Sequence, residues 1–172
     1  MDEKVTIRPA GVDDVGFLHR MLYEAAAWNP DWPREQVIDT LADPILERYH
    51  IGWGRPGDAG VIAELEGEPI GAAWYRLFTA ADPGFGFVDE RSPELGIAVG
   101  PLHRRTGVGT ALLEALIERA RTEGYPALSL SVAPSNRSRM MYERAGFERV
   151  GENHGAWTMR LDLTAARPST QD

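Results

Sequence analysis

The residues best suited to bind an anionic ligand lie between Arg104 and Thr110, in the run Arg-Arg-Thr-Gly-Val-Gly-Thr. Gly107 and Gly109 would let the backbone approach a ligand closely. The N–H groups of a first helical turn are free and carry the positive end of the helix dipole. With the charges of Arg104 and Arg105, this run predicts a cradle for phosphate groups.

Two common phosphate-binding classes do not fit this run. A dinucleotide fingerprint needs a third glycine, and Leu112 stands at the matching position. A P-loop needs Gly-Lys-Ser or Gly-Lys-Thr, whereas the only lysine of the chain is Lys4.

A different pattern fits. Arg104-x-x-Gly107-x-Gly109, after an expected strand Ile97-Ala98-Val99, resembles the acetyl-CoA signature Gln/Arg-x-x-Gly-x-Gly/Ala of the GNAT-type N-acetyltransferase superfamily. A second block, residues 136–147, is similar to the segment Asn-x-x-x-x-x-Tyr-Glu-Arg-x-Gly-Phe of that family. The resemblance covers nearly the whole chain, from Val5 to Leu163, and implies acetyl-CoA as a co-substrate.

The resemblance also implies roles for individual residues. The backbone from Arg105 to Thr110 would bind pyrophosphate, Ile97 and Val99 would pair with the pantetheine arm, and Asn136 would hydrogen-bond that arm. Thr106 and Arg137-Ser138 depart from the residues common in the family and would weaken phosphate affinity. The cofactor-binding residues so implied are Ile97, Ala98, Val99, Arg104, Arg105, Thr106, Gly107, Val108, Gly109, Thr110, Asn136, Arg139 and Tyr142.

The expected chemistry is direct attack of a neutral amine on the thioester, with the N–H of Val99 as our candidate to stabilise the tetrahedral intermediate. The resemblance places Tyr142 as general acid, and a hydroxyl of reference pKa ~10 suits protonation of the leaving thiolate. The other interpretation of Tyr142 is a half-buried aromatic of the core. No protein nucleophile is needed, and the chain contains no cysteine.

Three carboxylates compete for the role of general base. Glu94 opens the strand that leads to the thioester, and strand alternation places it on one face with Gly96 and Ala98. Asp89 and Glu90 on the preceding loop are competitors, and the base can also act through water. Alternatively, Glu94 is a solvated residue at a strand end.

The acceptor amine is expected to bind residues of the first half of the chain. Trp28, Asn29 and Trp32 interrupt an expected helix, and Tyr75 lies on an expected strand. Aromatic rings suit a cationic amine, although the tryptophans could equally fill the core beneath a loop.

The hydrophobic pattern predicts an α/β fold in the order β-α-α-β-β-β-α-β-α-β-β, a mixed, mostly antiparallel sheet of six or seven strands flanked by about four helices. The expected strands are residues 5–8, 61–65, 70–78, 94–99, 127–132, 147–151 and 156–163. The first expected helix begins at Asp13, the second runs from residue 33 or 34 to 41, the third runs from 108 to 122, and the fourth ends at Ala145. Residues 79–93 are expected to form a long loop.

A length of 172 residues favours one domain, placed at residues 1–164, with a flexible tail at 165–172. The net charge of -8 argues against a nucleic-acid partner. Residues 1–100 carry 18 acidic and 8 basic residues, whereas residues 101–172 carry 8 and 10. This split suits a cationic acceptor for the first half and an anionic cofactor for the second.

The remaining expectations concern metals, cellular location, partners and function. Four histidines show no metal-ligand spacing, so no metal is predicted. The absence of a signal peptide and of a long apolar run predicts a cytoplasmic protein without a membrane partner, as a monomer or homodimer. The leading function is an acetyl-CoA-dependent N-acetyltransferase acting on a primary amine of a small molecule or peptide. The rival is a non-catalytic acyl-CoA-binding or regulatory module of the same fold.

Overall fold

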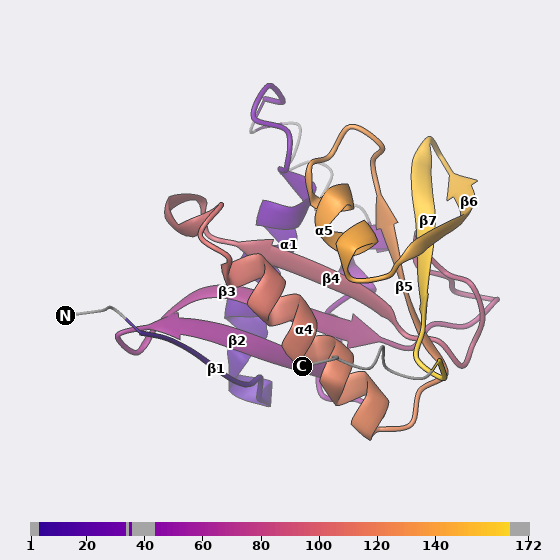
Figure 1. Ribbon diagram of the computed structural model, residues 1–172, viewed down its shortest axis with the longest axis horizontal. Helices are drawn as coiled ribbons and strands as arrows, with labels where there is room; N and C mark the ends of the chain where they lie inside the picture. Colours follow the sequence, from indigo (N-terminus) through magenta and orange to yellow (C-terminus); the bar gives the residue numbers. More distant parts are fainter. Residues whose placement is uncertain (1–3, 34, 36–43, 166–172) are drawn as a thin grey trace, which may run out of the picture.

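The computed structural model describes residues 4–33, 35 and 44–165. Its centre is a seven-stranded sheet with the strand order β1-β2-β3-β4-β5-β7-β6 (Figure 1). The strands are β1 Val5–Pro9, β2 Ala59–Leu65, β3 Glu68–Arg76, β4 Glu94–Val99, β5 Ala127–Val132, β6 Glu148–Asn153 and β7 Ala156–Asp162. Neighbouring strands are antiparallel except β4 and β5, which are parallel. The predicted mixed, mostly antiparallel sheet is confirmed.

The helices follow the predicted order with one addition. They are α1 Val15–Ala26, α3 Pro44–Glu47, α4 Val108–Thr122 and α5 Ser138–Arg144, and short 3-10 turns cover Val12–Asp14 and Pro101–His103. The sequence did not predict α3. The helix predicted between residue 33 or 34 and residue 41 lies almost wholly outside the described residues, as does the predicted tail apart from Ala165.

The helices cover both faces of the sheet. In Figure 1, α4 lies in front of β1 to β3, and α1 lies behind the sheet. Leu112, Leu113 and Leu116 of α4 are at most 1% exposed and pack on one face. Leu18 and Leu22 of α1 pack on the other face together with Trp74. Two separate apolar cores therefore hold the sheet rigid between them.

The sheet opens between its two central strands. The ladder between β4 and β5, both wholly described, is a single residue pair, Glu94 with Ser129. Next to it, the Ser129 N–H donates to the Pro93 carbonyl at 3.0 Å. Beyond this point β4 and β5 diverge, which leaves a gap in the sheet that begins at Glu94.

Backbone groups of β4 face this gap. The N–H of Gly100 donates to the Ile70 carbonyl at 2.7 Å, so Gly100 is directed toward β3. Because direction alternates along an antiparallel strand, the N–H and C=O groups of Ile97 and Val99 are directed toward β5. The gap is therefore lined by backbone groups that can pair with an extended ligand.

Candidate functional site

Glu94 is a buried carboxyl group with one oxygen bound and one oxygen free. It is 3% exposed, and its Oε1 accepts hydrogen bonds from the hydroxyl of Tyr49 at 2.7 Å and the N–H of Gly86 at 2.9 Å. Oε2 is also buried and has no hydrogen-bond partner. A buried carboxyl oxygen without a partner is costly, which makes Oε2 a candidate for contact with a substrate.

Burial raises the pKa of Glu94 from 4.5 to about 7. The hydrogen bonds from Tyr49 and Gly86 and the charge of Arg48 oppose this rise, but they do not cancel it. A carboxyl group with a pKa near neutrality can both accept and release a proton at physiological pH, as a general base must.

The segment Gly84-Phe85-Gly86 covers the narrow end of the gap. A Cβ atom on Gly84 would lie 1.9 Å from Glu94 Oε2, and one on Gly86 would lie 2.4 Å from the carbonyl carbon of Leu130 in β5. Only glycine fits at either position. This segment therefore lies against both Glu94 of β4 and the backbone of β5.

The two competing carboxylates have different surroundings. Glu90 Oε1 accepts a hydrogen bond from the N–H of Ala80, and Asp89 Oδ1 accepts one from the N–H of Arg91, both in exposed positions. Both side chains thus fasten the loop backbone. Glu94, in contrast, is buried.

Tyr142 lies in α5 and is buried against Phe147, with ring centroids 5.8 Å apart. Burial raises the pKa of its hydroxyl well above the usual value of 10. The hydroxyl therefore keeps its proton at neutral pH, which is the state a general acid needs.

The turn before α4 adopts a left-handed backbone twice. Arg105 has φ 61° and Gly107, the N-cap residue, has φ 86°. The Thr106 hydroxyl bonds to the His103 carbonyl at 2.5 Å and closes the turn. The following N–H groups of Val108, Gly109 and Thr110 begin the helix and have no partner within it. The predicted cradle residues are thus contiguous at one helix end.

Arg104 is directed away from the helix axis. Its Nε donates to the Val99 carbonyl at 3.2 Å, and its Nη2 pairs with Glu24 of α1 at 2.9 Å. Arg104 therefore joins the end of β4 to α1, and one backbone group that was expected to face pantetheine already has a protein partner.

The two remaining cofactor candidates belong to α5 and the turn before it. The side-chain oxygen of Asn136 accepts from the N–H of Ser138 at 3.0 Å, which leaves its amide group as a donor. The guanidinium of Arg139 lies 4.9 Å from the ring centre of Trp157 and 3.5 Å from Glu143. Both residues have local contacts that fix their positions.

The four predicted acceptor residues do not lie together. Trp28 and Trp32 meet edge to face at 5.2 Å in the turn after α1, where Asn29 Oδ1 accepts from the Asp31 N–H. Tyr75 is fully buried in the core under α4, and its hydroxyl donates to Glu123 at 2.8 Å. Because Tyr75 pairs with Leu95 across β3 and β4, it faces away from Glu94. Tyr75 therefore does not lie where a residue that binds the acceptor beside Glu94 would have to lie.

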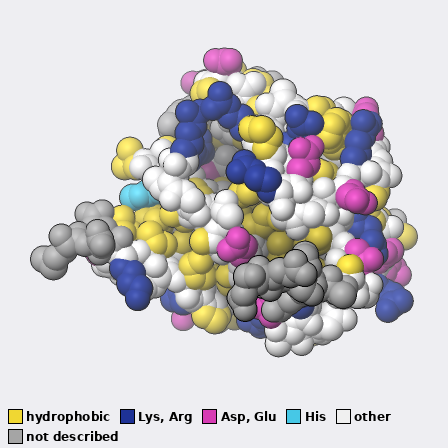
Figure 2. Space-filling view, in the orientation of Figure 1, with side chains coloured by type: hydrophobic (Ala, Val, Ile, Leu, Met, Phe, Trp, Pro, Cys, Tyr) yellow, Lys and Arg dark blue, Asp and Glu magenta, His cyan; other side chains and the backbone are white. Residues whose placement is uncertain are grey.

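Two clefts border the candidate site. One of about 500 Å³ lies between α4 and α5 and includes Thr110 and Met141. Figure 2 shows this side of the molecule, where basic side chains surround exposed apolar atoms. The other, of about 630 Å³, lies between residues 83–89 and strands β6 and β7, and Gly84 borders both this cleft and Glu94.

Sequence reasoning missed Tyr49, Gly84 and Gly86. The Gly-Phe-Gly run at residues 84–86 was a usable signal, since two close glycines in a long loop indicate close backbone contact. Tyr49 had no such signal, because 45 residues separate it from Glu94.

The described residues contain no group of three or more His, Asp or Glu side chains placed to hold a metal ion. None of their helices is long and apolar enough to cross a membrane.

Comparison with protein families gives a match to the Acetyltransferase (GNAT) family over residues 19–147. Among curated relatives, the L-methionine sulfoximine/L-methionine sulfone acetyltransferase of Pseudomonas paraeruginosa is 33% identical, with 92% of this chain and 91% of the relative covered. The L-amino acid N-acyltransferase MnaT of Escherichia coli is 29% identical over 85% of this chain and 80% of its own length.

Solved structures share the fold. The paia N-acetyltransferase of Thermoplasma acidophilum in complex with coenzyme A superposes with a TM-score of 0.70 at 15% identity, covering 92% of this chain and 99% of that one. The yncA acetyltransferase of Salmonella typhimurium, solved with acetyl-CoA, gives 0.65 at 21% identity, covering 98% and 99%.

Proposed function

This chain belongs to the acetyltransferase (GNAT) family of acetyl-CoA-dependent enzymes, and we propose that it acetylates a primary amine of a small molecule or peptide by direct transfer. Glu94 is the general base and Tyr142 the general acid. The observation that carries this proposal is the buried carboxyl of Glu94, which has one free oxygen and lies where β4 and β5 begin to diverge.

The gap between β4 and β5 fits the co-substrate. The backbone of Ile97 and the N–H of Val99 are directed into it, and an extended pantetheine arm can pair with such groups as a further strand would. The N–H groups after Gly107 suit the pyrophosphate, with Arg105 adding positive charge. Acetyl-CoA supplies an activated acyl group with a thiolate as leaving group.

The proton balance of the reaction uses both side chains. The amine nitrogen forms a bond to the thioester carbon and gives its proton to Glu94 Oε2. The bond from carbon to sulfur breaks, and the leaving thiolate takes a proton from the Tyr142 hydroxyl. Glu94 then releases its proton to solvent and Tyr142 regains one from solvent, which restores both groups. Burial raises the pKa of Tyr142, so its hydroxyl keeps its proton at neutral pH, and raises the pKa of Glu94 to about 7, so part of the Glu94 population is ionised there and can accept a proton.

The acceptor is best sought among amino acids. The two curated relatives compared above are named for acetyl or acyl transfer to amino acids or their analogues. Trp28, Asn29 and Trp32 remain candidate acceptor contacts, since the two indole rings form a partly exposed wall after α1. Tyr75 is left out, because its ring lies on the opposite face of the sheet from Glu94.

The test is thiol release from acetyl-CoA in the presence of a panel of amino acids, other small amines and peptides. We expect at least one amine to accelerate release, and Tyr142→Phe to lower kcat about 100-fold without loss of acetyl-CoA binding. Tyr23→Phe in α1 removes the same hydroxyl elsewhere and should keep the wild-type rate. Binding of acetyl-CoA with no turnover on any amine would instead favour the non-catalytic acyl-CoA module.

A further inference from the structure

A buried ion pair lies at the end of β3, next to Glu94. Arg76 is the cross-strand neighbour of Glu94, and its guanidinium binds both carboxyl oxygens of Asp58, at 2.8 Å from Nε and 2.7 Å from Nη2. The side chains of Arg76 and Asp58 are 0% and 1% exposed. Such a pair with good bidentate geometry fixes the position of whatever else it binds.

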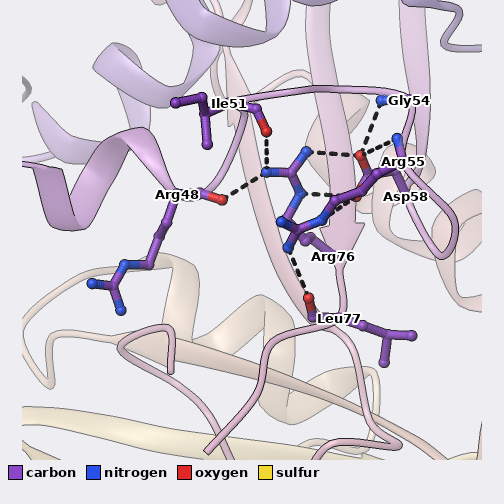
Figure 3. A network of polar contacts seen from close by, with 7 residues as sticks. All are labelled: Arg48, Ile51, Gly54, Arg55, Asp58, Arg76 and Leu77. Carbon is purple, nitrogen blue, oxygen red and sulfur yellow. Dashed lines mark hydrogen bonds and ion pairs between the residues drawn. The ribbon is translucent and has the colours of Figure 1, made fainter. Parts of the chain in front are cut away.

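The third nitrogen of Arg76 binds a separate segment of the chain. Nη1 donates to the carbonyl oxygens of Arg48 at 2.8 Å and Ile51 at 2.7 Å, as Figure 3 shows. Asp58 also accepts the N–H groups of Gly54 and Arg55 at 3.0 and 3.2 Å. Arg76 and Asp58 thus fasten residues 48–58 to the end of β3.

In the sequence, Tyr49 lies between Arg48 and Ile51, whose carbonyl groups accept hydrogen bonds from Arg76. Its ring is 6% exposed and packs edge to face against Phe78 at 5.2 Å. Its hydroxyl donates to Glu94 Oε1 at 2.7 Å and accepts the N–H of Phe85 at 2.9 Å. The hydroxyl therefore joins Glu94 to the glycine-containing segment at residues 84–86.

We propose that Tyr49, held in place by the Arg76–Asp58 pair, is a positioning residue that fixes Glu94 Oε1 and so presents Oε2 to the acceptor amine. The proposal deepens the proposed function and rests on it. Two donors on Oε1, Tyr49 and the N–H of Gly86, restrict rotation of the carboxyl group and leave Oε2 as the oxygen that still lacks a hydrogen-bond partner. Tyr49 acts through Glu94 and needs no contact with the substrate.

The groups around Glu94 define what the loss of Tyr49 would do. Tyr49 donates a hydrogen bond to Glu94, and Arg48 of the same segment adds a positive charge near it. The neighbour of Glu94 on β5 is the uncharged Ser129. Arg76 on β3 is already paired with Asp58. The hydrogen bond from Tyr49 lowers the pKa of Glu94, so removal of this bond should raise that pKa from its value of about 7.

The first experiment compares pH profiles of kcat/KM for wild type and Tyr49→Phe. We expect the midpoint attributed to Glu94 to move about one pH unit upward, because a hydrogen bond to a charged group is lost. At pH 7 kcat should fall about 5-fold, because the ionised fraction of Glu94 falls by that factor, with KM for acetyl-CoA unchanged. Tyr23→Phe, which removes a tyrosine hydroxyl in α1, is the matched control and should keep the wild-type profile.

A second experiment tests the role of the ion pair. Asp58→Asn keeps the shape of the side chain and weakens its hold on Arg76, so kcat at high pH, where Glu94 is ionised, should fall because Tyr49 is held less firmly. The double variant with Tyr49→Phe should have a kcat no lower than Tyr49→Phe alone, because both changes act on the same hydrogen bond. Additive losses of kcat would contradict an action of Asp58 through Tyr49.

Glu94→Gln separates this proposal from the proposed function. If Glu94→Gln removes the limb of the profile and Tyr49→Phe leaves both the midpoint and kcat as in wild type, the positioning role is wrong and the general base stands. If Glu94→Gln keeps the wild-type profile, the general base is wrong and the positioning role falls with it.

Discussion

Glu94 combines two properties that are seldom found together in a carboxyl group of a folded protein. It is nearly inaccessible to water, and one of its oxygens has no partner. Burial without a complete set of hydrogen bonds costs free energy, and the rise of its pKa to about 7 expresses that cost. The proposed general base is therefore partly ionised at neutral pH, and its burial costs stability.

This cost predicts how stability depends on pH. The folded-state pKa of Glu94, about 7, lies above its value of 4.5 without burial, so the folded chain binds this proton more tightly than the unfolded chain. The resulting stabilisation is fully present below pH 4.5 and is lost as the pH rises through 7. The stability of Glu94→Gln lacks this dependence on pH, because a glutamine side chain does not titrate.

Urea unfolding at pH 5 and pH 8 measures this effect. The free energy of unfolding of Glu94→Gln, relative to wild type, should increase between the two pH values by on the order of 2 kcal/mol. Glu90→Gln, at an exposed loop position, should show no such change. An equal difference for Glu94→Gln at both pH values would mean that Glu94 titrates normally in the folded chain.

At the scale of elements, two turns place the chemistry on a rigid sheet. Residues 84–86 lie against Glu94 and β5, and the turn at Arg105 to Gly107 begins α4. Both turns depend on glycine, for different reasons. Gly84 and Gly86 leave no room for a Cβ atom, whereas Gly107 has open space around it but a left-handed backbone.

Gly107→Ala tests the second turn. A Cβ atom on Gly107 would contact nothing within 4 Å, so the cost is the strain of φ 86°, about 1 kcal/mol of stability. Relief of that strain would turn the N–H groups of α4 away from the pyrophosphate. We therefore expect KM for acetyl-CoA to rise about 5- to 10-fold in steady-state kinetics.

Gly124→Ala provides the control at the other end of α4. Gly124 has φ 81° and likewise nothing within 4 Å, so the loss of stability should be similar. KM for acetyl-CoA should remain as in wild type. Equal changes of KM in both variants would show that strain alone, and not the position of Gly107, affects cofactor binding.

At the scale of the whole molecule, the sequence predicted the parts that local patterns define. The bounds of β4, α4 and β5 match the predicted ranges, because glycine and proline mark their ends and their apolar residues follow a clear period. Strand β3 ends at Arg76 instead of Phe78. An arginine in a sequence indicates a surface position, whereas here its partner Asp58 keeps it buried.

The rest of the site depends on contacts between distant segments. Tyr49 and Glu94 are 45 residues apart and meet because residues 48–58 are fastened to β3. Local pattern carries no information on such a contact. Tyr75 shows the same limit, because its place on an expected strand left open which face of the sheet its side chain would occupy.

The division of charge along the chain also has a structural counterpart. The basic residues that follow residue 100 include Arg105 in the turn before α4 and Arg139 in α5. Glu94 and the turn at Trp28 belong to the acidic half. This arrangement agrees with an anionic co-substrate and a cationic acceptor.

The pH profile of kcat/KM for the best amine, in wild type and Glu94→Gln, tests the central claim most directly. Wild type should show a limb with a midpoint near pH 7, which reflects the pKa of Glu94. Glu94→Gln should lack that limb and fall about 100-fold or more at pH 8, while Glu90→Gln keeps the wild-type profile. Full kcat/KM of Glu94→Gln across pH 6–9 would contradict the account.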